Sequence, residues 1–77
     1  MSDAKVLLLV EDERLILWTL QEMLEFGGYV VIAATCGVDA ITILDSRHPE
    51  IAGVVTDVRL GVGPNGWEVS WRARELQ

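Results

Sequence analysis

Three carboxylates directly follow two apolar runs in this sequence, where they could do chemistry together. Glu11 and Asp12 come after the run at residues 6–10, and Asp57 comes after the run at residues 51–56. Clustered carboxylates repel one another unless a cation neutralises them, and Mg²⁺ prefers hard oxygen ligands of this kind. A carboxylate beside such an ion can act as a nucleophile toward a phosphoryl group. The sequence therefore predicts a divalent-cation site with Asp57 as the candidate nucleophile.

These carboxylates meet only if the two runs are neighbouring strands of one parallel sheet. Short apolar, β-branched runs predict strands, and apolar residues at helical spacing predict helices between them. The expected strands cover residues 6–10, 29–34 and 51–56, and the expected helices cover residues 13–26, 38–46 and 67–76. Such alternation is typical of right-handed βαβ units in a doubly wound α/β fold. A flavodoxin-like strand order 2-1-3 would place the carboxyl ends of the first and third strands side by side.

Capping and turn residues set the expected ends of these elements. Asp12 is a candidate N-cap of the first helix, and the pair Gly27 and Gly28 supplies its stop. His48 and Pro49 end the second helix. A glycine-rich loop at residues 61–66 precedes the third helix.

Length, charge and cysteine content exclude several classes of protein. The chain has 77 residues, which is enough for one small domain, and 51% of them are hydrophobic. Its net charge of −6 argues against direct binding to nucleic acid. The single cysteine, Cys36, can form no internal disulfide, and the run at residues 6–10 is too short for a signal segment or a membrane span. We therefore expect a cytoplasmic protein.

Three segments of the chain together resemble the receiver domain of two-component response regulators. They are VLLLVEDE at residues 6–13, VVTDVRL at residues 54–60 and PNG at residues 64–66. The resemblance covers nearly the whole chain. An acidic pair after the first strand is a weak signal alone, but the pair together with an aspartate that ends the third strand is fairly specific.

The resemblance implies a role for each of the acidic residues. In such a receiver, Asp57 accepts a phosphoryl group from a sensor histidine kinase. Mg²⁺ is held by Glu11, Asp12 and Asp57, and the backbone carbonyl of Arg59 completes the protein ligands. The chain would then be a signalling module and phosphoprotein, not a turnover enzyme.

The sequence departs from the receiver pattern in two respects. A receiver has five βα units and this chain has three, so residues 1–77 are expected to form a partial domain. The family's switch Ser or Thr after strand four and its Lys after strand five are absent. Lys5 precedes the first strand and lies on the order of 15 Å or more from the carboxylate edge, so it cannot replace the missing lysine. The segment from Asp57 to Gly66 is also one residue longer than usual, and Pro64 comes late in it.

The missing units leave two surfaces open to a partner. The strand at residues 51–56 would become a sheet edge with unpaired backbone groups, and residues 15–18 of the first helix are all apolar. We therefore expect a homodimer or a higher assembly through that edge or that helix. The alternative functions are a non-phosphorylated interaction or assembly module, or an inactive fragment of a longer response regulator.

Other conspicuous residues favour structural roles. His48 lies in a loop before a proline and is expected at the surface without a role, and Cys36 is expected to be a buried or half-buried thiol. Trp67 and Trp71 are four positions apart on the third helix, which favours core packing over an interface. The loop glycines lack the context of a phosphate-binding motif, so we interpret them as giving the loop its flexibility.

Overall fold

The chain forms a three-stranded parallel sheet with helices on both faces. The computed structural model describes residues 4–56 and 66–76. In chain order, the elements are β1 (Val6–Val10), α1 (Arg14–Phe26), β2 (Val30–Ala34), α2 (Gly37–Arg47), the 3₁₀ helix η1 (His48–Glu50), β3 (Ile51–Thr56) and α3 (Gly66–Glu75). The strand order is β2-β1-β3, which confirms the predicted doubly wound arrangement. No helix in the described part of the chain is long and apolar enough to span a bilayer.

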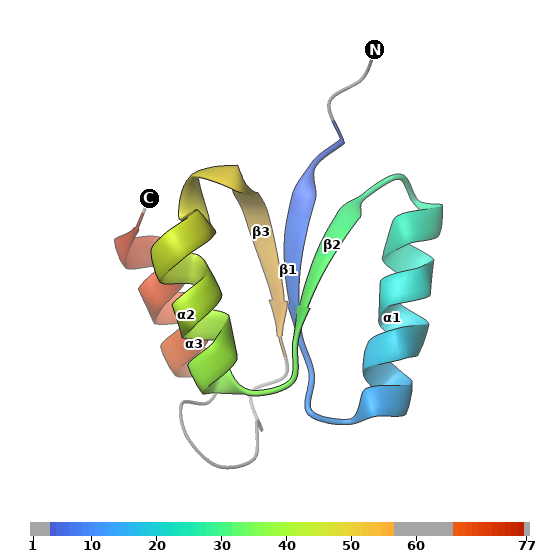
Figure 1. The fold of residues 1–77 in the computed structure, drawn as a ribbon, viewed down its shortest axis with the longest axis horizontal. Helices are drawn as coiled ribbons and strands as arrows, with labels where there is room; N and C mark the ends of the chain where they lie inside the picture. The colour runs from blue at the N-terminus through green and yellow to red at the C-terminus, as the bar shows by residue number, and fades with distance from the viewer. Residues whose placement is uncertain (1–3, 57–65, 77) are drawn as a thin grey trace.

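The helices form two unequal layers around the sheet. α1 covers one face, whereas α2 and α3 lie side by side on the other (Figure 1). Side chains of β1 alternate between the faces, so Leu8 and Val10 enter the core with α2 and α3, while the equally buried Leu9 points the other way. Leu44 of α2 and Val69 of α3 complete the centre of that core. The main hydrophobic core therefore lies between the sheet and the pair α2 and α3.

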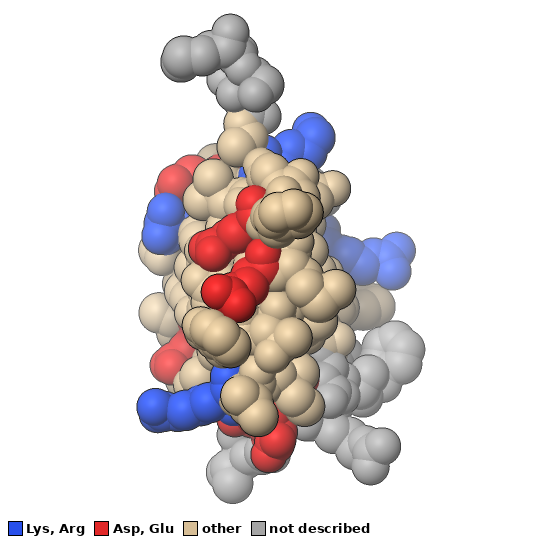
Figure 2. Space-filling view, turned by 90° about the vertical axis from the view of Figure 1, so that its right-hand side faces the viewer, with Lys and Arg blue, Asp and Glu red and all other residues tan. Residues whose placement is uncertain are grey.

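The layer formed by α1 is much less buried than the layer formed by α2 and α3. None of its residues is buried, and the side chains of Leu15 and Phe26 are 74% and 96% exposed. This side of the molecule is mainly uncharged, with a group of carboxylates in its upper half (Figure 2). The helix's own carboxylates in its second half are Glu22 and Glu25. The prediction that α1 carries more apolar surface than the sheet covers agrees with these exposures.

The ends of α1 differ in part from the prediction. Its N-cap is Glu13, which makes no side-chain capping hydrogen bond, so the assignment of Asp12 as N-cap is wrong. The helix starts one residue later than expected. The carboxylate that accepts a hydrogen bond from a backbone N–H at this start is that of Glu11, and the donor is the N–H of Glu13. At the other end, the predicted stop is confirmed. Gly27 is the C-cap and Gly28 adopts a φ of 96°, which favours glycine.

The pairing of β1 with β3 contains one irregularity. Val6 pairs with Ile51, but Leu7 pairs with Gly53, so Ala52 is the extra residue of a bulge. A Cβ at Gly53 would lie 3.2 Å from Leu7 Cδ2, so a glycine lets the two strands approach closely here. Beyond the bulge, the pairing is regular as far as Val10 and Thr56.

The prediction that Trp71 packs in the core is wrong. Its side chain is 66% exposed, whereas Val69, two positions earlier, is fully buried. Positions two apart on a helix lie on nearly opposite sides, so the burial of Val69 turns Trp71 outward. The side chain of Trp67 lies outside the described residues.

Two leucines on helices give a direct test of the unequal layers. Leu44→Ala in α2 removes a side chain that is 2% exposed, so we expect a loss of about 2 to 5 kcal/mol in the free energy of unfolding. Leu15→Ala in α1 is the matched control, and its effect should stay within about 0.5 kcal/mol. Urea unfolding followed by circular dichroism measures both. Equal losses in the two variants would contradict the description of the core.

Candidate functional site

Glu11 is the first residue after β1, and its backbone position is fixed by the sheet. Its N–H donates to the carbonyl of Ala34 at 3.1 Å, which continues the ladder between β1 and β2. Its side chain is only 6% exposed, and it is the one buried charged group among the described residues. Oε2 accepts a hydrogen bond from the N–H of Glu13 at 3.0 Å. The carboxylate is therefore held at the carboxyl end of the sheet and also orders the start of α1.

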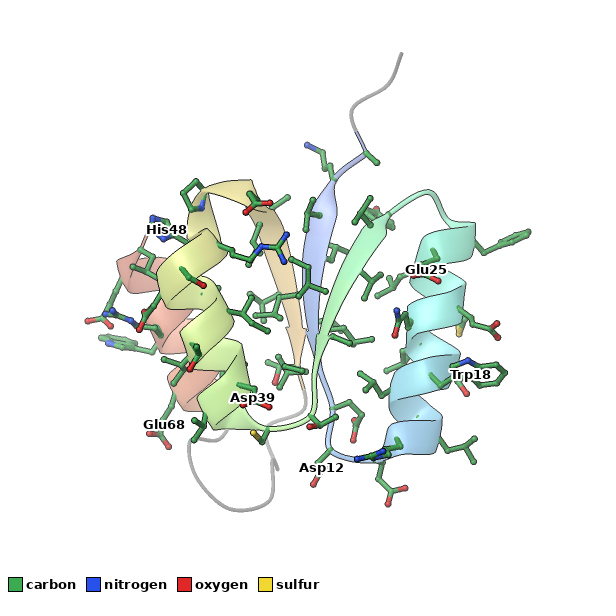
Figure 3. The ribbon with its side chains drawn as sticks, in the orientation of Figure 1. Asp12, Trp18, Glu25, Asp39, His48 and Glu68 are labelled. Carbon is green, nitrogen blue, oxygen red and sulfur yellow. The ribbon has the colours of Figure 1, made fainter. Side chains whose placement is uncertain are left out.

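Asp12 lies beside Glu11 in the turn between β1 and α1. Its side chain is exposed at the end of the molecule where the strands finish, the same end that carries Asp39 of α2 and Glu68 of α3 (Figure 3). The two predicted acids after β1 thus differ in environment, because Glu11 is buried while Asp12 is exposed to solvent. Both lie at the edge of the sheet where ligands bind in open α/β folds.

The end of β3 lies next to the end of β1. Val10 pairs with Thr56, so the last residues of the two strands are direct neighbours across the ladder. Thr56 is half-buried and brings a hydroxyl group to this edge. The sequence analysis did not single out Thr56, because its place beside Val10 follows only from the strand register. Asp57 follows Thr56 in the chain. Asp57 and Arg59 both lie outside the described residues.

The described residues supply part of the predicted metal site. Within them, no group of three or more His, Cys, Asp or Glu side chains is placed to hold a metal ion. Two of the four predicted ligands, Glu11 and Asp12, lie at the carboxyl edge of the sheet. The other two, Asp57 and Arg59, lie outside the described residues. The donors in the described part are carboxylate oxygens, which are of the kind that Mg²⁺ binds.

Cys36 and Lys5 lie as expected, whereas His48, which was expected in a surface loop, is half-buried at the start of the 3₁₀ helix η1. The Nδ1 atom of His48 is 3.2 Å from the carbonyl oxygen of Leu44, an interaction that ties the ring to the end of α2. Cys36 is a half-buried free thiol at the N-cap of α2. Lys5 is exposed ahead of β1, at the opposite end of this strand from Glu11.

The hydrogen bond from Glu13 to Glu11 predicts a difference between two variants of Glu11. Glu11→Gln removes the charge but keeps an oxygen acceptor, whereas Glu11→Ala removes both. We expect the alanine variant to be less stable than the glutamine variant by about 1 kcal/mol, because the Glu13 N–H loses its partner. Urea unfolding in a chelating buffer measures the difference without any contribution from metal. Equal stability of the two variants would show that the hydrogen bond does not order α1.

Comparison with solved structures identifies this fold. Neither the protein-family models nor the curated proteins gave a match. Among solved structures, a response regulator receiver protein from Sinorhizobium medicae is 39% identical with a TM-score of 0.92. That match covers 97% of this chain and 60% of the relative, so the chain spans less than two thirds of it.

Two further solved structures have the same fold at lower identity. A response regulator receiver domain protein from Clostridium thermocellum is 22% identical with a TM-score of 0.87, over 95% of this chain and 57% of that one. A fusion described as carrying a yeast Spc42 trimeric coiled coil is 24% identical with a TM-score of 0.88, over 97% of this chain and 49% of that one. The chain therefore has the receiver fold of response regulators, as its sequence predicted, and its described residues form three βα units of that fold.

Proposed function

We propose that this chain is a phosphoacceptor module of two-component signalling in the cytoplasm. Asp57 accepts a phosphoryl group from a sensor histidine kinase, and Mg²⁺ is held by Glu11, Asp12, Asp57 and the backbone carbonyl of Arg59. The observation that carries the proposal is the pairing of Val10 with Thr56. Each of these residues is followed in the chain by an acid, so the pairing supports an arrangement in which both acidic segments lie at one edge.

The residues at this edge have the chemistry that the proposal requires. The buried carboxylate of Glu11 is held by the Glu13 N–H and by the continuation of the β1 ladder, so its position does not depend on a bound ion. Asp12 is exposed next to it, where a cation from solvent can reach its carboxylate. A bound Mg²⁺ would offset negative charge on the oxygens of the transferring phosphoryl group.

The proposed reaction is a transfer between two amino-acid side chains. A carboxylate oxygen of Asp57 forms a bond to phosphorus while the bond from phosphorus to the imidazole nitrogen of the kinase breaks. The electron pair of the broken bond returns to the imidazole, which takes up a proton from solvent. The product is an acyl phosphate on this chain, so the chain is consumed once per transfer and does not turn over as an enzyme would.

Intact mass after incubation with acetyl phosphate tests the proposal. We expect a gain of one phosphoryl unit that requires Mg²⁺ and is abolished by Asp57→Asn. Asp12→Asn should raise the Mg²⁺ concentration needed for half-maximal labelling by at least about tenfold, because it removes a ligand oxygen.

The matched control is Asp39→Asn. Asp39 is an exposed acid in the first turn of α2, at the same end of the molecule as Asp12 but outside the proposed site (Figure 3). Its labelling should equal that of the native chain. Labelling that persists in Asp57→Asn, or that proceeds equally well in a chelating buffer, would contradict the proposed site.

Two observations favour an assembly module as the second candidate function. β3 forms one edge of the sheet, and Leu15 and Phe26 of α1 are largely exposed. Open strand edges and apolar surface favour association with another chain. On this account, the chain forms a homodimer or a higher assembly whether or not it is phosphorylated.

Sedimentation equilibrium of the native chain and two variants tests self-association. Leu15→Glu adds a charge to the exposed face of α1, and Ala52→Lys adds a charge at the exposed edge strand. We expect the native chain to be dimeric or larger, and one of these substitutions to weaken the assembly about tenfold or more. A monomeric native chain across the whole concentration range would exclude the assembly module.

A further inference from the structure

A groove runs between α2 and α3 on the side of the molecule away from α1. It has a volume of about 460 Å³, which falls within the range typical of binding sites. Ile41 from α2 and Trp71 from α3 supply its apolar walls, and Glu68, Arg72 and Glu75 supply its polar rim. The proposed metal site does not account for this groove, because none of its residues lines the groove.

Trp71 is exposed in the groove although the core of α3 is already complete. Val69 is fully buried, and Ala73 and Leu76 pack against the same core. The indole of Trp71 is therefore not needed to cover the sheet, and 66% of its surface faces solvent. An exposed tryptophan in a concave surface is more typical of a contact site than of a structural residue.

The rim of the groove is acidic. Glu68 and Glu75 are three positions before and four positions after Trp71, so all three side chains share one face of α3. Arg72 is the one basic residue of the rim, and its Nε donates to Asp45 Oδ1 at 2.7 Å while its Nη1 lies 3.5 Å from Glu75 Oε1. The hydrogen bond to Asp45, and next to it the charge of that carboxylate, raise the pKa of Arg72. The rim and the adjoining Asp45 thus hold three carboxylates and one guanidinium, which is paired with Asp45 and Glu75.

The ion pair between Arg72 and Asp45 also connects the two walls of the groove. It joins α3 to α2 across 27 positions of sequence. Both side chains are partly exposed, so the pair contributes little to stability. The two walls are held mainly by the core, in which Leu44 of α2 and Val69 of α3 are buried in one cluster. A groove with fixed walls can accept a partner with a small loss of conformational entropy.

We propose that this groove is a docking site for a basic amphipathic helix of a partner protein, in which an arginine stacks on Trp71 between Glu68 and Glu75. Apolar side chains one turn away on the partner helix would contact Ile41. An arginine suits the site because its guanidinium stacks on an indole face and pairs with carboxylates. The net charge of −6 would draw such a partner to the chain and repel an acidic one. Amphipathic helices commonly bind in apolar grooves of this kind.

This inference goes beyond the proposed phosphoryl transfer and does not depend on it. The groove lies in the layer formed by α2 and α3, and none of its lining residues belongs to the proposed metal site. Phosphorylation assays and binding assays can therefore fail or succeed separately.

Titration of the ¹⁵N-labelled native chain with three synthetic helical peptides tests the docking site. The first peptide is built of Leu, Ala and Arg with the arginines on one face, the second has Gln in place of every Arg, and the third has Glu. We expect the arginine peptide to shift the backbone amides of Ile41, Trp71 and Glu75. The glutamine peptide should bind at least about fivefold more weakly, and the glutamate peptide should not bind.

Variants of the native chain assign the binding to named side chains. Trp71→Ala should weaken binding of the arginine peptide about fivefold or more, and Glu75→Gln about threefold. Because Trp71 is exposed, its replacement should leave the circular dichroism spectrum unchanged. Trp18→Ala is the matched control, since Trp18 is an exposed tryptophan on α1, and it should bind the peptide as the native chain does. Shifts confined to α1, or equal binding of the arginine and glutamine peptides, would overturn the proposal.

Discussion

The parallel pairing of β1 with both of its neighbours is the constraint on which the rest of this structure depends. β1 is hydrogen-bonded on both edges, and Leu8, Leu9 and Val10 are almost completely removed from solvent. A strand buried on both faces and both edges cannot shift in register without exposing these side chains. The position of Glu11 follows directly, because its own N–H continues the ladder to Ala34. The acidic edge is therefore a consequence of how β1 is buried.

The two faces of the sheet contribute unequally to the free energy of unfolding. The side of α2 and α3 contains most of the fully buried residues, so it dominates the free energy of unfolding. On the other side, α1 contacts the sheet through the half-buried Leu17, Leu20 and Leu24 and leaves larger apolar groups in solvent. Apart from a group of carboxylates, the exposed side of α1 is mainly uncharged (Figure 2). Changes on that surface can alter association while they leave the core intact.

How much the sequence revealed depended on the kind of interaction. The bounds of β1 and β3 were predicted to the residue, because each is a short run rich in apolar residues between two charged residues. The start of α1 was wrong by one position, since Asp12 and Glu13 are both acids and only the backbone conformation selects Glu13 as the cap. Apolar spacing also misplaced Trp71, because periodicity does not say which face of a helix meets the sheet.

Interactions between distant parts of the chain were the least predictable. The pair of Arg72 with Asp45 joins two helices whose relative position no local pattern contains. The register that brings Thr56 beside Val10 likewise follows from the bulge at Ala52, which the sequence does not announce. For the candidate site, the structure places Glu11 and Asp12 at the predicted edge, and the roles of Asp57 and Arg59 stay predictions.

The most direct test of the central claim is to locate the phosphorylated residue itself. Reduction of an aspartyl phosphate with borohydride converts that aspartate to homoserine, which tandem mass spectrometry identifies within a peptide. After treatment of the native chain with acetyl phosphate and Mg²⁺, we predict homoserine at position 57 and at no other acid. A phosphorylated Glu11 would instead give 2-amino-5-hydroxypentanoic acid, and a phosphorylated Asp12 would give homoserine at position 12. Either of these products in place of homoserine at position 57, or no modification in a folded chain, would contradict the proposed phosphoacceptor site.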